Sequence, residues 1–182
     1  MRKINGKISL ILIILIIFHI IMGASQMIGI TQLSPEWKKF VSYFMVGLLL
    51  IHITCGILLT INPINNSKIT KARYLNLNKR FWISRVTGVL IIILGGYHIW
   101  FFMAKEEQRL NIFGELQLFM SLLLVVSILI HVLLNIRPSF ISMGFKKFRI
   151  FVKDTGVIMI VVFVIAFFAF IMYYLRWNIL WQ

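Results

Sequence analysis

The chain has four histidines, and each lies in a different long apolar stretch: His19, His52, His98 and His131. A neutral imidazole is a good ligand for a metal ion, and an ionisable side chain inside such a stretch is rare and usually functional. The spacing from His19 to His52 is 33 residues, and the spacing from His98 to His131 is the same. A single histidine of this kind is often a hydrogen-bonded core residue. The equal spacing of all four favours two pairs of metal ligands.

An internal repeat relates the histidines. A shift of 79 residues superimposes His19 on His98 and His52 on His131. The same shift matches polar residues that are scarce in membrane helices, namely Glu36 with Glu115 and Ser42 with Ser121. Repeats of this kind are common in membrane proteins. We therefore expect a duplicated two-helix hairpin in residues 1–138, with repeat 1 over about 1–62 and repeat 2 over about 80–138. A basic loop and a fifth helix follow in residues 139–182.

The elements that must position these residues are predicted from hydropathy. The chain is 60% hydrophobic over 182 residues, with a mean hydropathy of +0.95. Each apolar segment is long enough to cross about 30 Å of hydrocarbon at about 1.5 Å per residue. The segments are roughly 8–30, 40–62, 82–104, 116–136 and 155–175. The sequence predicts an all-α membrane protein with five transmembrane helices. Because Pro35, Pro63 and Pro138 fall at or beyond segment ends, we expect helices to stop there.

Basic residues flank the segments unevenly. Thirteen Lys and Arg lie on the side of the N-terminus and five on the opposite side. By the positive-inside rule, the N-terminus is predicted to be cytoplasmic and the C-terminus outside, in the inner membrane of the cell. The net charge of +14 arises mainly in short loops, which favours contact with anionic lipid over nucleic acid.

Several classes of site are excluded by composition. Cys55 is the only cysteine, so no intrachain disulfide, cysteine zinc site, iron–sulfur cluster or covalent haem attachment is expected. No glycine-rich nucleotide loop is visible. No Asp or Glu lies within a segment core, which argues against a carboxylate proton relay.

Depth in the bilayer pairs the histidines. His98 is seven residues before Lys105, which places it about 10 Å from the outer surface, and His131 is six before Arg137, about 9 Å from the inner surface. The repeat gives His19 the depth of His98, and His52 that of His131. Two facing imidazoles at one level of a helix bundle are what a six-coordinate haem iron needs. We therefore expect His19 and His98 to hold an outer haem, and His52 and His131 an inner haem. Small residues near the ligands would give a porphyrin room: Gly23, Gly56, Gly95 and Gly96.

This pattern resembles the cytochrome b561 family, in which four consecutive helices each supply one histidine to two haems on opposite sides of the membrane. Bacterial di-haem cytochrome b subunits of quinone-linked dehydrogenases and hydrogenases are a related comparison. The resemblance covers the first four helices and implies two non-covalent b-type haems. The family has six helices, whereas five are predicted here. Succinate dehydrogenase anchors also have five helices and two haems. In those proteins the middle helix has no haem ligand, whereas here it is the fifth helix that has none.

The stretch of residues 71–85 is basic and aromatic, and Arg85 lies a turn inside the third segment. A guanidinium at that depth needs a partner, so Arg85 is a candidate contact for a haem propionate or a quinone. The alternative is that Arg85 extends to the lipid headgroups.

These observations predict a b-type cytochrome that carries electrons across the bilayer between a reductant or quinone and an acceptor or partner reductase. It would act as an electron-transfer protein or as the cytochrome subunit of an oxidoreductase, with a dehydrogenase or reductase as partner subunit. Two alternatives stay open at this point. One is a transporter in which the histidines bind metal ions, and the other is a non-catalytic membrane anchor.

Overall fold

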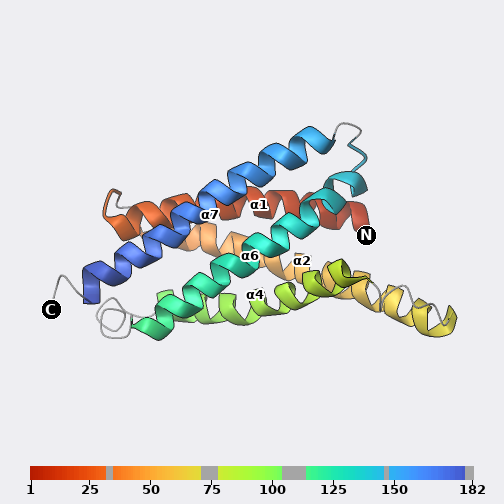
Figure 1. The fold of residues 1–182 in the computed structure, drawn as a ribbon, viewed down its shortest axis with the longest axis horizontal. Coiled ribbons are helices and arrows are strands. Elements are labelled where there is room, and N and C mark those ends of the chain that lie inside the picture. The colour runs from red at the N-terminus through yellow and green to blue at the C-terminus, as the bar shows by residue number, and fades with distance from the viewer. Residues whose placement is uncertain (32–34, 71–77, 104–113, 146–147, 179–182) are drawn as a thin grey trace.

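A computed structural model of the chain is all-helical, and its five described helices are each long and apolar enough to span a membrane. The structure describes residues 1–31, 35–70, 78–103, 114–145 and 148–178. In chain order the helices are α1 (Arg2–Ile28), α2 (Pro35–Thr70), α4 (Lys79–Met103), α6 (Glu115–Ser142) and α7 (Phe148–Asn178). They lie roughly along one long axis (Figure 1). The prediction of an all-α, multi-pass membrane protein is confirmed at this level.

The helices form because long runs of Ile, Leu, Val and Phe must satisfy every backbone polar group internally in a bilayer. α1 ends at Gly29, whose φ of 85° is in the left-handed region that favours glycine. The amides of Gly29 and Ile30 then bond to the carbonyl groups of Gln26 and Ser25. This cap turns the chain at the end of the first span.

Two of the three prolines do not end helices, which corrects the prediction. Pro35 begins α2, but α2 continues through residue 63 to Thr70, and Pro138 lies inside α6. Proline removes one backbone donor, yet packing can preserve a membrane helix around it. Beyond Pro138, the last turn of α6 is buried at Ser139 and Phe140, and α1 packs closely against it.

The packing of the helices places the histidines on diagonals. α1 packs against α2, α6 and α7, and α6 packs against α4 and α7. The four histidine-bearing helices therefore follow the order α2, α1, α6, α4, with α1 opposite α4 and α2 opposite α6. Neither diagonal pair is closely packed. The buried hydrophobic core joins Met159 and Phe163 of α7 to Ile13 of α1 and Val125 of α6, and it includes Phe101 of α4.

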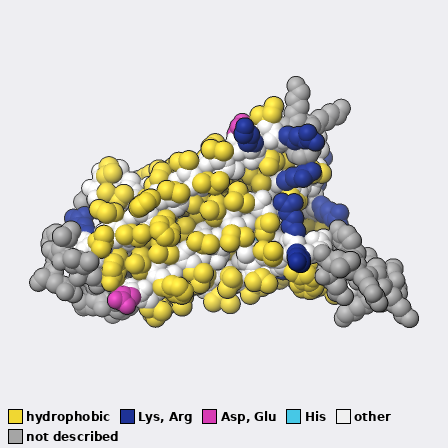
Figure 2. Space-filling view, in the orientation of Figure 1, with side chains coloured by type: hydrophobic (Ala, Val, Ile, Leu, Met, Phe, Trp, Pro, Cys, Tyr) yellow, Lys and Arg dark blue, Asp and Glu magenta, His cyan; other side chains and the backbone are white. Residues whose placement is uncertain are grey.

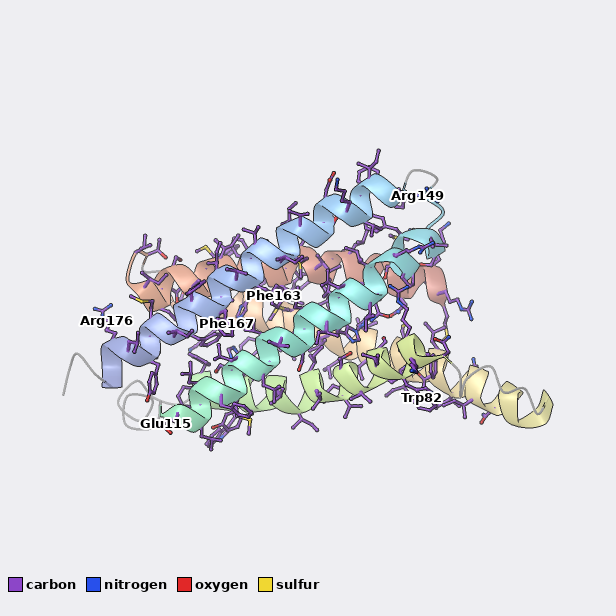
Figure 3. All side chains as sticks on the ribbon, viewed as in Figure 1. Trp82, Glu115, Arg149, Phe163, Phe167 and Arg176 are labelled. Atoms are coloured by element: carbon purple, nitrogen blue, oxygen red, sulfur yellow. The ribbon has the colours of Figure 1, made fainter. Side chains whose placement is uncertain are left out.

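Charge is concentrated at the ends of the molecule. Figure 2 shows hydrophobic side chains along the body and most Lys and Arg at the end where the N-terminus and the start of α7 lie. Arg149 and Trp82 lie at that end, and Glu115 lies at the other (Figure 3). This distribution is typical of a protein whose sides face lipid.

Candidate functional site

The first pair of histidines joins α1 and α4. The ring centroids of His19 and His98 are 6.3 Å apart, and the ring planes are at 73° to each other. The ring of Phe102, one turn beyond His98, lies 4.6 Å from the His98 ring. The structure thus brings together two residues 79 positions apart in sequence, which the depth argument had predicted to share one level.

The second pair joins α2 and α6 with nearly the same geometry. The ring centroids of His52 and His131 are 6.4 Å apart, and their planes are at 86°. Both pairs lie across a diagonal of the four helices, between helices that are not closely packed. The pairing is as predicted, while the binding of a cofactor by these residues stays a prediction.

The centroid separation suits one metal ion between two imidazoles. A metal–imidazole bond is about 2 Å long. Since the ring centre lies about 1 Å beyond the nitrogen, two such rings on opposite sides of an ion have centres about 6 Å apart. In the described part of the chain, no group of three or more His, Cys, Asp and Glu comes together. Two protein ligands per site fit haem, whose macrocycle supplies the remaining in-plane ligands, better than a tetrahedral protein-only site.

Hydrogen bonds fix the inner imidazole of α6. Nδ1 of His131 is 3.1 Å from Oγ1 of Thr87, which donates its own proton to the carbonyl oxygen of Ile83 at 2.9 Å. With its proton directed to that carbonyl, the Thr87 oxygen can accept a hydrogen bond from Nδ1–H of His131. The lone pair of this imidazole is then on Nε2, as a metal ligand requires.

The α2 imidazole has an equivalent partner. Oγ of Ser9 donates to the carbonyl oxygen of Asn5 at 2.7 Å and lies 3.4 Å from Nδ1 of His52. In the same way, the Ser9 oxygen can accept a hydrogen bond from Nδ1–H of His52 over this longer distance. Among the described residues, neither Nε2 atom of the inner pair has a hydrogen-bond partner. Two lone pairs are therefore available for one ion.

A second polar contact holds α4 against α6. Oγ of Ser84 donates to Oδ1 of Asn135 at 2.9 Å, and Nδ2 of Asn135 donates to the carbonyl oxygen of His131 at 2.7 Å. This network is centred one turn from the imidazole, so it fixes the rotation of α6 at the ligand position. Sequence reasoning missed Ser9 and Asn135. The signal that could have identified Ser9 is its position in the repeat, where it corresponds to Gly88.

The repeat is visible in the contacts of the two hairpins. Ser9 lies against His52, and Gly88, 79 residues further on, lies against His131. A Cβ added to Gly88 would be 3.4 Å from Cε1 of His131, so the helices approach closely there. Ser9 and Gly88 each lie ten residues from the histidine of their own helix. The two imidazole pairs are consequently at two levels, about 15 Å apart along the helices.

Space is available beside three of the ligands. A Cβ added to Gly23, Gly56, Gly95 or Gly96 would have nothing within 4 Å. Gly23 and Gly56 follow His19 and His52 by four residues, which places each on the same face as its histidine. This room is what a flat macrocycle would need next to its axial ligands.

Arg85 lies near the inner pair. Its guanidinium carbon is 4.9 Å from the centre of the Phe81 ring, and its buried Nε has no hydrogen-bond partner. The charge is close enough to His52 and His131 to interact with both electrostatically. Within the ranges that the structure covers, Arg85 has no acidic partner. A half-buried cation of this kind suits an anionic group bound at the inner site. Residues 71–77 of the predicted basic and aromatic stretch lie outside the described residues.

Comparisons with protein-family models, curated proteins and solved structures found no match to this chain.

Proposed function

We propose that the chain is a b-type membrane cytochrome that holds two haems and carries electrons across the bilayer. The observation that carries the proposal is the geometry of the imidazoles. Two pairs span the diagonals of a four-helix arrangement, each with a centroid separation suited to a single iron. This arrangement is similar to that of the cytochrome b561 family, despite the absence of a sixth described helix.

Each residue of the site has a distinct task in this proposal. His19 and His98 hold the outer haem, and His52 and His131 hold the inner one. Bound haem supplies reversible one-electron chemistry, and the protein adjusts its potential through ligand hydrogen bonds and burial. Thr87 keeps the His131 ring in the tautomer and orientation that ligation needs.

Arg85 provides a counter-charge at the inner site. A haem carries two carboxylates at its rim, and a carboxylate taken out of water needs a cation or several donors. Among the described residues, Arg85 carries a positive charge that interacts electrostatically with both inner imidazoles. We assign it to a propionate of the inner haem, with a quinone head group as the alternative ligand.

The wider setting follows from charge and topology. We place the N-terminus on the cytoplasmic side of the inner membrane, because most Lys and Arg are at that end of the bundle. An electron would pass between the inner and outer haems, which are about 15 Å apart by helix rise. A quinone, a small-molecule reductant or a partner dehydrogenase or reductase would exchange electrons with them at the two faces.

The proposal is tested by optical spectra of the purified protein. Oxidised and dithionite-reduced spectra, with a pyridine haemochrome count, are expected to show two non-covalent b-type haems per chain. His19→Ala and His52→Ala should each lose one haem. Protein from haem-replete cells that has no Soret band would overturn the proposal.

A further inference from the structure

The outer end of the α4–α6 interface contains polar atoms with no partner. Nδ1 of His98, both amide atoms of Gln117 and Oγ of Ser121 are buried and make no hydrogen bond. Gln117 is 2% exposed and Ser121 is 3% exposed. Buried polar groups are nearly always paired, so several unpaired atoms in one region need an explanation.

The contacts between α4 and α6 indicate which residues of the two helices lie at the same level. Thr87 and Gly88 contact His131, and Ser84 contacts Asn135 one turn along. Because the helices run antiparallel, residue numbers rise along α4 in the direction in which they fall along α6. His98 is therefore level with Ser121.

By the same register, Phe102 is level with Gln117. Phe101, Phe102, Leu118 and Leu122 all belong to the hydrophobic cluster shared by α1, α4, α6 and α7, which is compatible with this alignment. Gln117 therefore lies about one turn beyond Ser121, toward the outer surface.

Gln117 lies on the face of α6 that carries His131. Gln117 precedes His131 by fourteen residues, which is just under four turns, so both lie on one face. The hydroxyl of Ser121 is also available. Several other hydroxyls bond the carbonyl group four residues before them, as in Ser9, Thr60, Thr87 and Ser139. Ser121 does not.

The inner site shows how such atoms are satisfied. There, Nδ1 of His131 bonds to Thr87, and the amide of Asn135 bonds to Ser84 and to the backbone. At the outer site an imidazole, a hydroxyl and an amide are present but unpaired. The difference indicates that the outer set is completed by a bound group.

We propose that Gln117 and Ser121 are positioning residues of the outer haem. This inference rests on the proposed function. Once iron holds the His98 ring, Oγ of Ser121 accepts the hydrogen bond from Nδ1–H of His98. Nε2 of Gln117 donates to a propionate carboxylate, one turn nearer the outer surface. Carboxylates are the strongest acceptors on the rim of haem, and a neutral amide donor suits one that lies near the surface.

The test uses Gln117→Leu and Ser121→Ala in the full chain. Haem dissociation is measured by transfer to an excess of apomyoglobin, and the potential of the outer haem by redox titration followed optically. Because His52→Ala removes an inner ligand, the same changes in that background report on the outer haem alone. We expect the outer haem to dissociate about 10–100-fold faster, as for other residues that hydrogen-bond to metal ligands. Ser121→Thr, which keeps the hydroxyl, should restore the dissociation rate.

Controls separate this role from general packing. Ser127→Ala makes the same chemical change as Ser121→Ala on α6, away from the His98 level, and should leave the outer haem unchanged. In haem-free protein, the Gln117→Leu variant should melt at the same or a higher temperature, because it removes an unpaired buried amide. A lower melting temperature in haem-free protein would overturn the inference. So would unchanged dissociation and potential in a protein that binds two haems, and that result would leave the proposed function intact.

Discussion

Nδ1 of His131 lies 3.1 Å from Oγ1 of Thr87, and the same hydroxyl donates to the carbonyl oxygen of Ile83 at 2.9 Å. A hydroxyl has one proton to give, and the helix carbonyl is its nearest acceptor. When the carbonyl receives that proton, the imidazole supplies its own from Nδ1. In that arrangement a residue on α4 leaves Nε2 of an α6 imidazole free to bind a metal ion.

The first prediction concerns this hydroxyl. Thr87→Val keeps the shape of the side chain but removes the acceptor for Nδ1–H, so the inner haem should be held about 10–100-fold less tightly. Pyridine haemochrome counts and haem-transfer rates measure the effect. Thr54→Val is the matched control, because Thr54 is exposed and bonds only its own helix at Leu50. Equal haem retention in the two variants would remove Thr87 from the site.

The second prediction uses the pairing of His19 with His98. If the two imidazoles hold one iron, each single alanine substitution removes the same haem, and the double substitution removes no more. Combining His19→Ala with His52→Ala should instead remove both haems. Haem counts per chain distinguish these cases. A further loss in the His19→Ala/His98→Ala double variant would mean that the two residues serve different cofactors.

The sequence was sufficient for the spans and for the pairing of histidines, but not for the hydrogen bonds around them. Hydropathy locates five helices, and the repeat assigns His19 to the level of His98. Ser9 and Asn135 were missed because Ile and Leu occur on every face of the helices that carry them. With no polar face to fix its rotation, a helix does not reveal from its sequence which residue meets an imidazole.

The prolines illustrate a second limit. Local rules predict that a helix ends near Pro138, and the structure shows the helix continuing to Ser142. In the structure, Gly6 from a distant part of the chain packs against this turn. Tertiary packing of this kind overrides a local preference and is not visible in a short window of sequence.

The third prediction tests the contact between Gly6 of α1 and the last turn of α6. A Cβ at Gly6 would be 2.5 Å from Oγ of Ser142 and 3.1 Å from the backbone oxygen of Ser139. Gly6→Ala should therefore destabilise the protein by about 1–3 kcal/mol, the usual cost of overpacking. Thermal unfolding in detergent measures this. Gly47→Ala is the control, because nothing lies within 4 Å of its added Cβ. Ser142→Ala should recover only part of the loss, since the backbone oxygen stays in place.

The fourth prediction concerns orientation. In a Cys55→Ser background, Lys3→Cys and Glu115→Cys place single thiols at exposed positions at opposite ends of the molecule. A membrane-impermeant maleimide added to intact spheroplasts should label the thiol at position 115 and leave the one at position 3 unlabelled until the membrane is opened. The reverse pattern would show that the basic end faces outward and would exchange the names of the inner and outer sites.

The fifth prediction separates two roles for Arg85. If its guanidinium pairs with a haem propionate, Arg85→Met should weaken retention of the inner haem by about tenfold, in line with the loss of a charge-assisted hydrogen bond of about 1.5 kcal/mol or more. In haem-free protein the same substitution should not reduce stability, because Nε of Arg85 is buried without a partner there. Haem transfer and thermal unfolding supply the two measurements.

Two further variants make the Arg85 test specific. Arg85→Lys keeps the charge but loses the planar donor geometry, so its retention of the inner haem should lie between those of wild type and Arg85→Met. Arg80→Met removes an exposed charge five residues earlier and should change neither haem. If Arg85→Met retains the inner haem as well as Arg80→Met does, Arg85 interacts with the lipid headgroups instead. The carboxylates of the inner haem would then need a donor other than Arg85.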